Sequence, residues 1–160
     1  MTAIISECRK YRYRLTRELS ASGVGSVCFV MLNPSTADET KDDPTIRRCI
    51  GFANSLGAAR LDVVNLFAFR STSPEFLYGM SKSMAIGPEN DQHIVEACNL
   101  ARIIICAWGN RGALFERSDE VLRIIRTHGR PMALKINSKC GQPAHPLYLK
   151  ANPINLTELA

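Results

Sequence analysis

The chain has 160 residues, of which 46% are hydrophobic and 22% are charged. These values are ordinary for one globular domain with its own core, so residues 1–160 are treated as a single domain. The composition excludes collagen, coiled coil and wholesale disorder. Lys and Arg exceed Asp and Glu by 20 to 15, a formal net charge of +5. This excess is consistent with an anionic partner and equally with a solubilising surface.

The sequence contains no membrane or metal-binding signal. No apolar run approaches the roughly 20 residues of a membrane helix. In the first residues, MTAIISECRKYRYR, charged side chains follow too early to leave the apolar stretch that a signal peptide needs. The six cysteines form no C-x-x-C pair, and the three histidines lie far apart. We therefore expect a cytoplasmic protein with reduced cysteines, no metal, no other cofactor and no membrane partner.

The first predicted strands differ in pattern. Residues 11–19 alternate with period two, which predicts a half-exposed strand. After turn residues at 20–26, the continuous apolar run 27–32 (VCFVML) predicts a strand buried on both faces. We expect the first strand to pair antiparallel with this second one at an edge of the sheet.

Helices and strands alternate along the rest of the chain. Asp43-Pro44 is a helix-start signal, and apolar residues at helical spacing follow as far as Gly57. The other predicted elements are strands at 61–69, 102–108 and 131–136 and helices at 89–100 and 113–128. The long irregular stretch 70–88 has a length typical of functional or flexible loops. This order predicts an α/β fold, a three-layer αβα sandwich with a mostly parallel central sheet.

Such a sheet places its ligands beyond the carboxyl ends of the parallel strands. Each predicted strand delivers polar or glycine residues to that edge: residues 33–38 after the second strand, Asn65 and Arg70 at the end of the third, residues 109–112 after the fourth, and Ser138, Lys139, Gly141, His145 and Pro146 after the last. The sequence therefore predicts a binding site at this edge.

The residue types at the edge favour a heterocyclic ligand. The amides of Asn33 and Asn65 can donate and accept together, as the edge of a nucleobase requires. His145 could donate to a developing anion. Arg70 and Lys139 could hold a phosphate.

Ordinary structural roles compete with these assignments. Asn33-Pro34 also fits a simple turn, and Asp43 fits a helix cap. Phe67 and Trp108 are more typical of a core than of a stacking surface. Asn65 lies inside an apolar strand, so its amide needs a partner, which is either structural or a ligand.

Five segments carry a recognisable pattern: 31–38 (MLNPSTAD), 43–49 (DPTIRRC), 64–70 (VNLFAFR), 107–110 (AWGN) and 145–149 (HPLYL). Together they closely resemble a bacterial family of unknown function, DUF1643. In the same order they are more distantly similar to the motifs of the uracil-DNA glycosylase superfamily, which implies the αβα fold of that superfamily.

The second resemblance implies roles for individual residues. Asn33 would orient the attacking water, Asn65 would read the base edge, and His145 would stabilise charge on the departing base. Asp38 or Asp43 would support the cationic sugar. Further ligand contacts would come from Pro34, Ser35, Thr36, Phe67, Trp108, Gly109, Asn110, Pro146 and Tyr148, and phosphate contacts from Arg47, Arg48, Arg70 and Lys139. This mechanism needs no cofactor.

The leading hypothesis is an N-glycosidase-like enzyme that acts on a base in nucleic acid or in a nucleotide. One alternative is a non-catalytic binder of nucleic acid or of a modified nucleotide. Another is a nucleotide-modifying enzyme on the same scaffold, for which Asp38, Asp42 or Asp43 could hold a divalent ion. A structural partner protein is a third, for which an exposed apolar patch would matter more than the polar edge.

Overall fold

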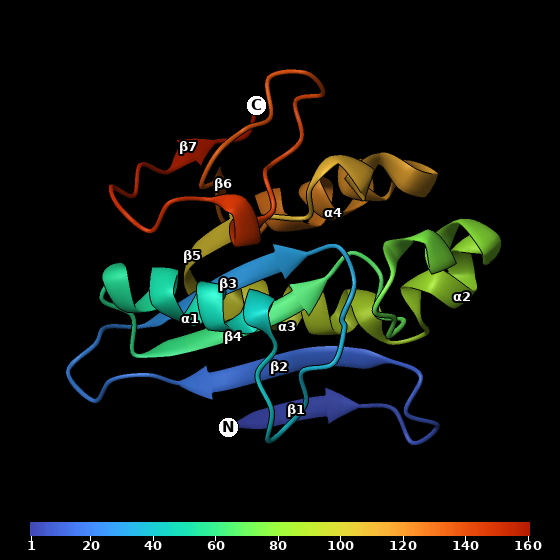
Figure 1. Cartoon of the computed structure of the whole chain (residues 1–160), viewed down its shortest axis with the longest axis horizontal. Helices are drawn as coiled ribbons and strands as arrows, with labels where there is room; N and C mark the ends of the chain where they lie inside the picture. Colours follow the sequence, from blue (N-terminus) through green and yellow to red (C-terminus); the bar gives the residue numbers. More distant parts are fainter.

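The computed structural model describes residues 1–160 as one mixed sheet of seven strands packed against helices (Figure 1). The strands are β1 (Thr2–Ile5), β2 (Arg12–Glu18), β3 (Ser26–Met31), β4 (Arg60–Asn65), β5 (Ala101–Cys106), β6 (Pro131–Ala133) and β7 (Thr157–Glu158). The α-helices are α1 (Pro44–Ser55), α2 (Lys82–Ile86), α3 (Asn90–Leu100) and α4 (Arg117–Arg126), with 3-10 turns η1 (Pro74–Gly79), η2 (Asn110–Glu116) and η3 (Pro146–Tyr148). The predicted α/β class is confirmed.

The strand order is β1-β2-β4-β3-β5-β6-β7. The pairs β4–β3, β3–β5 and β5–β6 are parallel, whereas β1–β2, β2–β4 and β6–β7 are antiparallel. The sheet is therefore only partly parallel, because β1 and β7, which the sequence pattern did not predict, add antiparallel edges. Both are short, and β7 is exposed along its length, so neither has the apolar run that marks a strand.

The predicted pairing of the first strand was wrong. β2 pairs with β4, with Leu15 opposite Val63, and not with β3. The reason is topological: β3 already has parallel neighbours on both sides, β4 and β5, so it has no free edge. The prediction that β2 is half-exposed was also wrong, since Arg12–Arg17 are all buried.

The core lies on both faces of β3, whose six residues are all buried as predicted. Val27 and Phe29 belong to a cluster that includes Ile46 and Phe52 of α1. Cys28 and Val30, which alternate with them along the strand, belong to a second cluster that includes side chains of α3 and α4. Alternation along one strand thus places α1 on one face and α3 and α4 on the other.

The third predicted strand, 61–69, ends four residues early, at Asn65. The backbone carbonyl groups at this point accept hydrogen bonds from side chains. The Asn90 Nδ2 donates to the carbonyls of Asn65 (2.9 Å) and Leu66 (3.0 Å), and the Arg117 Nε donates to that of Leu66 (2.9 Å). The end of β4 is therefore fixed by α3 and α4, and this end carries the site described below.

All six cysteines are free thiols, and four of them are buried. None of the helices is both long enough and apolar enough to cross a membrane.

Candidate functional site

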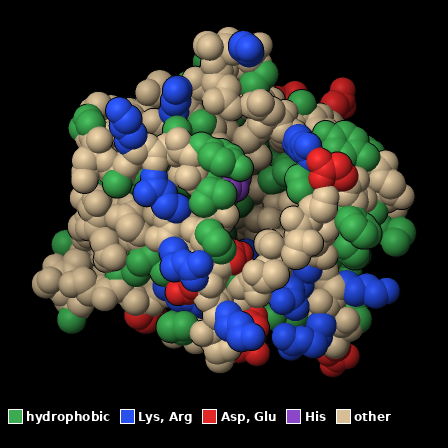
Figure 2. All heavy atoms as spheres, in the orientation of Figure 1, with side chains coloured by type: hydrophobic (Ala, Val, Ile, Leu, Met, Phe, Trp, Pro, Cys, Tyr) green, Lys and Arg blue, Asp and Glu red, His purple; other side chains and the backbone are tan.

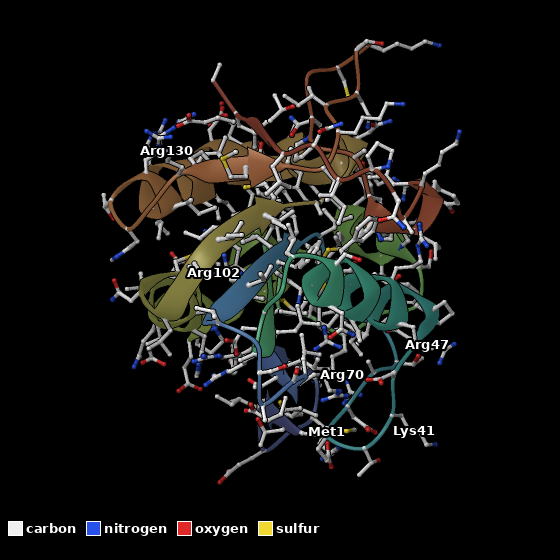
Figure 3. The ribbon with its side chains drawn as sticks, turned by 90° about the vertical axis from the view of Figure 1, so that its left-hand side faces the viewer. Met1, Lys41, Arg47, Arg70, Arg102 and Arg130 are labelled. Atoms are coloured by element: carbon white, nitrogen blue, oxygen red, sulfur yellow. The ribbon has the colours of Figure 1, made fainter.

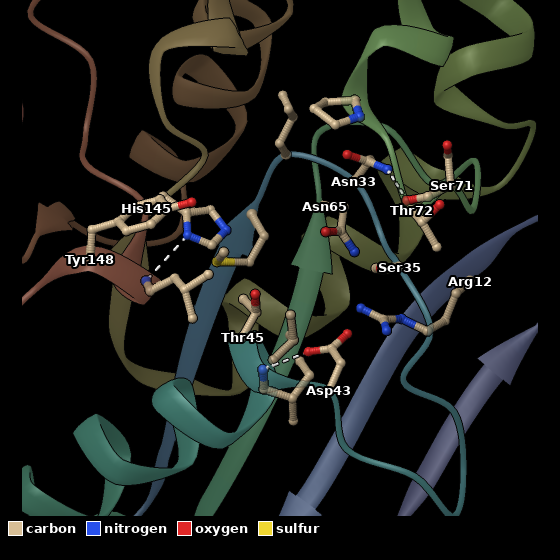
Figure 4. A pocket seen from close by; sticks show the side chains of 16 residues that line it. Arg12, Asn33, Ser35, Asp43, Thr45, Asn65, Ser71, Thr72, His145 and Tyr148 are labelled. Carbon is tan, nitrogen blue, oxygen red and sulfur yellow. Dashed lines mark hydrogen bonds between the residues drawn. The ribbon is translucent and has the colours of Figure 1, made fainter.

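A cavity of about 340 Å³ opens at the carboxyl ends of β3 and β4 (Figure 4). The imidazole of a histidine is visible inside the opening on the face of Figure 2. The lining residues come from β2 to β4, from the loops after β3 and β4, and from the starts of α1, η1 and η3: Arg12, Met31, Leu32, Asn33, Ser35, Asp43, Thr45, Ile46, Val63, Asn65, Ser71, Thr72, Pro74, His145, Leu147 and Tyr148. The predicted edge of the sheet thus holds a cavity.

Asn65 is the last residue of β4, and it lines this cavity while only 1% exposed. Neither its Nδ2 nor its Oδ1 has a hydrogen-bond partner within the protein. A buried polar group without a partner costs about 1–3 kcal/mol of stability, so such groups are rare in folded proteins. The amide is therefore available to a ligand, as one donor group and one acceptor side by side.

Asn33 follows β3, and its side chain connects the loop after β3 to the loop after β4 by hydrogen bonds. Its Nδ2 donates to the carbonyls of Pro34 (3.2 Å) and Ser71 (3.1 Å), and the Ser71 amide donates back to Pro34 (2.9 Å). These bonds fix the side chain and occupy its donor group. The Oδ1 makes no hydrogen bond within the protein, so it is free to accept one from a water molecule or a ligand.

His145 precedes η3 and faces the cavity from the side opposite Arg12 (Figure 4). Its Nδ1 accepts a hydrogen bond from the Leu147 amide at 3.2 Å. Burial lowers the pKa of His145 below its usual 6.5, an effect that the Asp43 charge partly offsets. The ring is therefore neutral at pH 7, and because Nδ1 accepts, its proton is on Nε2. That nitrogen points into the cavity and can donate there.

Arg12 and Asp43 form the polar wall opposite His145 (Figure 4). Asp43 caps α1: its Oδ1 accepts from the Ile46 amide (2.8 Å) and its Oδ2 from the Ala37 amide (3.3 Å). Arg12 is 2% exposed, and its one hydrogen bond runs from Nη1 to the Ala37 carbonyl (3.0 Å). Burial lowers the pKa of Arg12 to about 10, so it is a cation at pH 7.

Five of the residues predicted for the site line this cavity: Asn33, Ser35, Asn65, His145 and Tyr148. Tyr148 is 86% exposed and lies at the rim. Asp43, named as an alternative to Asp38, also lines the cavity. Asp38 does not, because its Oδ1 is occupied by the Thr40 and Lys41 amides in a local turn.

The remaining ligand contacts predicted from the sequence lie outside the cavity. Phe67 and Trp108 are core residues, at 0% and 1% exposure. The Trp108 Nε1 donates to the Gln142 Oε1 at 2.7 Å. Gly109 adopts φ +76° and donates to the Pro143 carbonyl, so it helps to position the segment that leads to His145. The others are Pro34 and Pro146, which are buried, Thr36, which is exposed, and Asn110, which accepts from Asn137.

None of the predicted phosphate ligands lines the cavity. Arg47 donates to the Asp42 carbonyl, and Figure 3 shows it on the outer side of α1. Arg48 stacks over Phe52, Arg70 donates to the Arg9 carbonyl, and Lys139 is exposed in a loop. The cation in the cavity is Arg12, which the period-two pattern assigned to an ordinary strand face.

Further lining residues were missed for a similar reason. Ser71 and Thr72 lie outside the five motif segments, whereas Thr45 and Leu147 lie inside the segments 43–49 and 145–149 but were given no role there. The length of the irregular stretch 70–88 was the one signal for Ser71 and Thr72, since loops of that length are often functional. No group of three or more His, Cys, Asp or Glu side chains is arranged to hold a metal ion.

Comparison with known proteins identifies a family for this chain but no activity. No curated protein and no solved structure matches the chain. One family model matches residues 12–147 and is described as a protein of unknown function, DUF1643. That match covers most of the chain, and with it the four parallel strands and every residue that lines the cavity except Tyr148. The chain therefore belongs to the DUF1643 family.

Proposed function

We propose that this protein binds a nucleobase in the cavity and hydrolyses the N-glycosidic bond that joins the base to its sugar. The observation that carries the proposal is the Asn65 amide, which is 1% exposed, lines the cavity and has no partner for either polar atom. An amide in this state is matched by a ligand that offers a donor and an acceptor next to each other. The edge of every nucleobase has that arrangement.

The cavity suits such a ligand in size and in lining. Its volume of about 340 Å³ falls at the lower end of the range of small-molecule sites, roughly 300–1,000 Å³. Met31, Ile46 and Val63 supply apolar contacts for a ring. Tyr148 presents an exposed aromatic ring at the rim, where a planar ligand can stack.

Three other groups supply the chemistry. The free Oδ1 of Asn33 accepts a hydrogen bond from the attacking water and orients it toward the sugar carbon. As the new carbon–oxygen bond forms, the carbon–nitrogen bond breaks and the electron pair leaves with the base. The water gives up one proton and the base anion takes one up, so the products are the sugar with a free hydroxyl group and the neutral base. The Nε2 proton of neutral His145 stabilises that anion, as a positioned donor does in an oxyanion hole. The Asp43 carboxylate stabilises the cationic character of the sugar.

The roles proposed for Asn33, Asn65 and His145 are those that the resemblance of the sequence motifs to the uracil-DNA glycosylase superfamily implies, and this relationship is part of the proposal. We extend it to the fold: the sheet, with α1 on one face and α3 and α4 on the other, is proposed to be the three-layer sandwich of that superfamily. A shared fold alone does not establish the reaction, so the proposal depends on the site.

The test is release of free base, detected by mass spectrometry. Purified protein is incubated with nucleosides, nucleoside monophosphates and oligonucleotides that carry uracil, hypoxanthine, mismatched thymine or alkylated bases. We expect release from one class of substrate, lowered at least 100-fold by Asn33→Ala and by His145→Ala. Matched controls are Asn99→Ala and His128→Ala. Asn99 is exposed on α3 and is hydrogen-bonded to His128, which is half-buried just after α4, and neither lines the cavity.

The controls should keep full activity. Binding of a base without release, at the same affinity in wild type and His145→Ala, would contradict hydrolysis and favour the non-catalytic alternative. Neither binding nor release across the panel would contradict the proposal as a whole.

A further inference from the structure

We infer that Arg12 and Ser35 form a subsite for a phosphate group on the ligand, so that a nucleoside monophosphate, rather than a nucleoside, fills the cavity. The inference rests on the proposed function for the base, while the phosphate subsite stands on separate observations. It concerns the one Lys or Arg side chain that lines the cavity.

Arg12 differs from the other buried arginines. Four arginines are buried: Arg12, Arg14, Arg17 and Arg117. Arg14 pairs with Asp62, Arg17 with Asp42, and Arg117 with Asp91 and Glu120. Arg12 forms no ion pair and makes a single hydrogen bond, to the Ala37 carbonyl. Its Nε has no partner. Most of its donor groups are thus unused in the protein.

Asp43 lines the same cavity as Arg12 and raises the pKa of its guanidinium, but the two side chains form no ion pair. Both oxygens of Asp43 accept hydrogen bonds from backbone amides, those of Ile46 and Ala37. Asp43 also lies at the N-terminus of α1, whose positive end stabilises its negative charge. Asp43 therefore compensates the charge of Arg12 only in part, because burial outweighs its effect and lowers the pKa of the guanidinium to about 10.

The geometry suits an oxyanion. Figure 4 shows the end of the guanidinium directed into the cavity, with Ser35 between it and Asn65. The Ser35 hydroxyl also lines the cavity and makes no hydrogen bond within the protein. A guanidinium with free donors beside a free hydroxyl is a typical phosphate site, because charge-assisted hydrogen bonds to phosphate are strong. The order of Asn65, Ser35 and Arg12 places base and phosphate in one cavity.

The experiment compares each of the four common deoxynucleosides with its 5′-monophosphate and with inorganic phosphate, by calorimetric titration and thermal shift. We expect the wild type to bind at least one monophosphate tenfold or more tightly than its nucleoside. Arg12→Met should remove that preference and leave nucleoside affinity within threefold of wild type. Arg12→Lys keeps the positive charge but loses the planar set of guanidinium donors, so it should retain part of the preference for the monophosphate.

Two controls separate this role from a structural one. Arg123→Met makes the same change on the exposed side of α4 and should keep the full preference. The Tm of ligand-free Arg12→Met should equal or exceed that of wild type, because the substitution removes a buried charge with one hydrogen bond. A structural arginine would instead lower the Tm on removal.

The outcomes distinguish the two proposals. Equal affinity for nucleosides and monophosphates, or a phosphate preference that survives Arg12→Met, overturns the phosphate subsite and leaves base binding intact. Binding of inorganic phosphate that depends on Arg12, without binding of any nucleoside, supports the subsite and contradicts the base proposal. No response to any probe overturns both.

Discussion

The buried amide of Asn65 has a cost in stability. Its buried amide makes no hydrogen bond inside the protein, so replacement by an apolar side chain of similar size removes a desolvation penalty. We predict that Asn65→Leu raises the free energy of unfolding by about 1–3 kcal/mol and abolishes ligand binding. Denaturant titration and calorimetry measure the two effects.

Asn90 provides the matched control. It is equally buried, but its Nδ2 donates to two carbonyls at the end of β4. Asn90→Leu should therefore lower the free energy of unfolding. A stability loss in Asn65→Leu as large as that in Asn90→Leu would mean that Asn65 has a structural partner after all.

His145 gives the second prediction, a dependence of stability on pH. Because burial lowers its pKa in the folded state, the unfolded chain takes up a proton at a higher pH than the folded protein does. The contribution of neutral His145 is complete above about pH 6.5 and decreases as the pH falls from there to the folded-state pKa. His145→Gln should remove this part of the pH dependence between pH 7.5 and 5, measured by denaturant titration. An unchanged profile would contradict it.

The sequence predicted the residues whose chemistry is unusual for their position. An asparagine at the end of an apolar strand and a histidine at the same sheet edge were visible as candidates, and both line the cavity. Arg12 was not, because it lies in a run of alternating charges that resembles an exposed strand face. Its burial depends on β1 and on the loop around Ala37, which contact Arg12 in the fold but cannot be read from the pattern of residues 11–19.

β2 and β4 are joined by buried charge as well as by backbone hydrogen bonds. The Asp62 Oδ1 accepts from the Arg14 Nε (3.0 Å), the Thr16 Oγ1 (2.8 Å) and the Arg60 Nη2 (3.0 Å), while Asp62 is fully buried. Removal of one partner of a buried ion pair leaves an uncompensated charge. We predict that Asp62→Asn lowers the free energy of unfolding by about 3–5 kcal/mol.

The comparison variant is Asp42→Asn. Asp42 is 26% exposed in its side chain, and its partner Arg17 also donates to the carbonyls of Thr16 and Lys41. Its substitution should therefore cost less than half as much in the same denaturant titration. Equal losses would show that the carbonyl groups do not support Arg17.

Elements were predictable where hydrophobic pattern alone decides them. β3, β4 and β5, with α1 and α3, follow apolar runs and helical spacing, and each occurs where the sequence indicated it. The pairing of β2 could not be read locally, because it depends on which edge of the sheet the crossovers leave free. The early end of β4 depends on Asn90 and Arg117, which are distant in sequence.

The surface of the molecule carries less net positive charge than the composition of the whole chain suggests. Four arginines and two aspartates are buried, so two of the five excess positive charges are internal and three are left for the surface. On the face that carries the opening, Lys and Arg are interspersed with Asp and Glu (Figure 2). Such a surface offers no continuous track for a polynucleotide backbone.

The last prediction follows from this distribution and concerns salt. A protein that contacts six to ten phosphates of a nucleic acid loses about 10³–10⁵ in affinity between 50 and 200 mM salt. Here the cation proposed to bind the phosphate is Arg12, inside a cavity where salt screens it less than at the surface. We therefore expect the Kd of a bound monophosphate to rise less than tenfold over this range, by calorimetry. A single-stranded 20-mer should compete no better than the monophosphate at equal nucleotide concentration. A steep salt dependence with strong competition by the 20-mer would instead place the substrate within a nucleic-acid strand, held by surface cations.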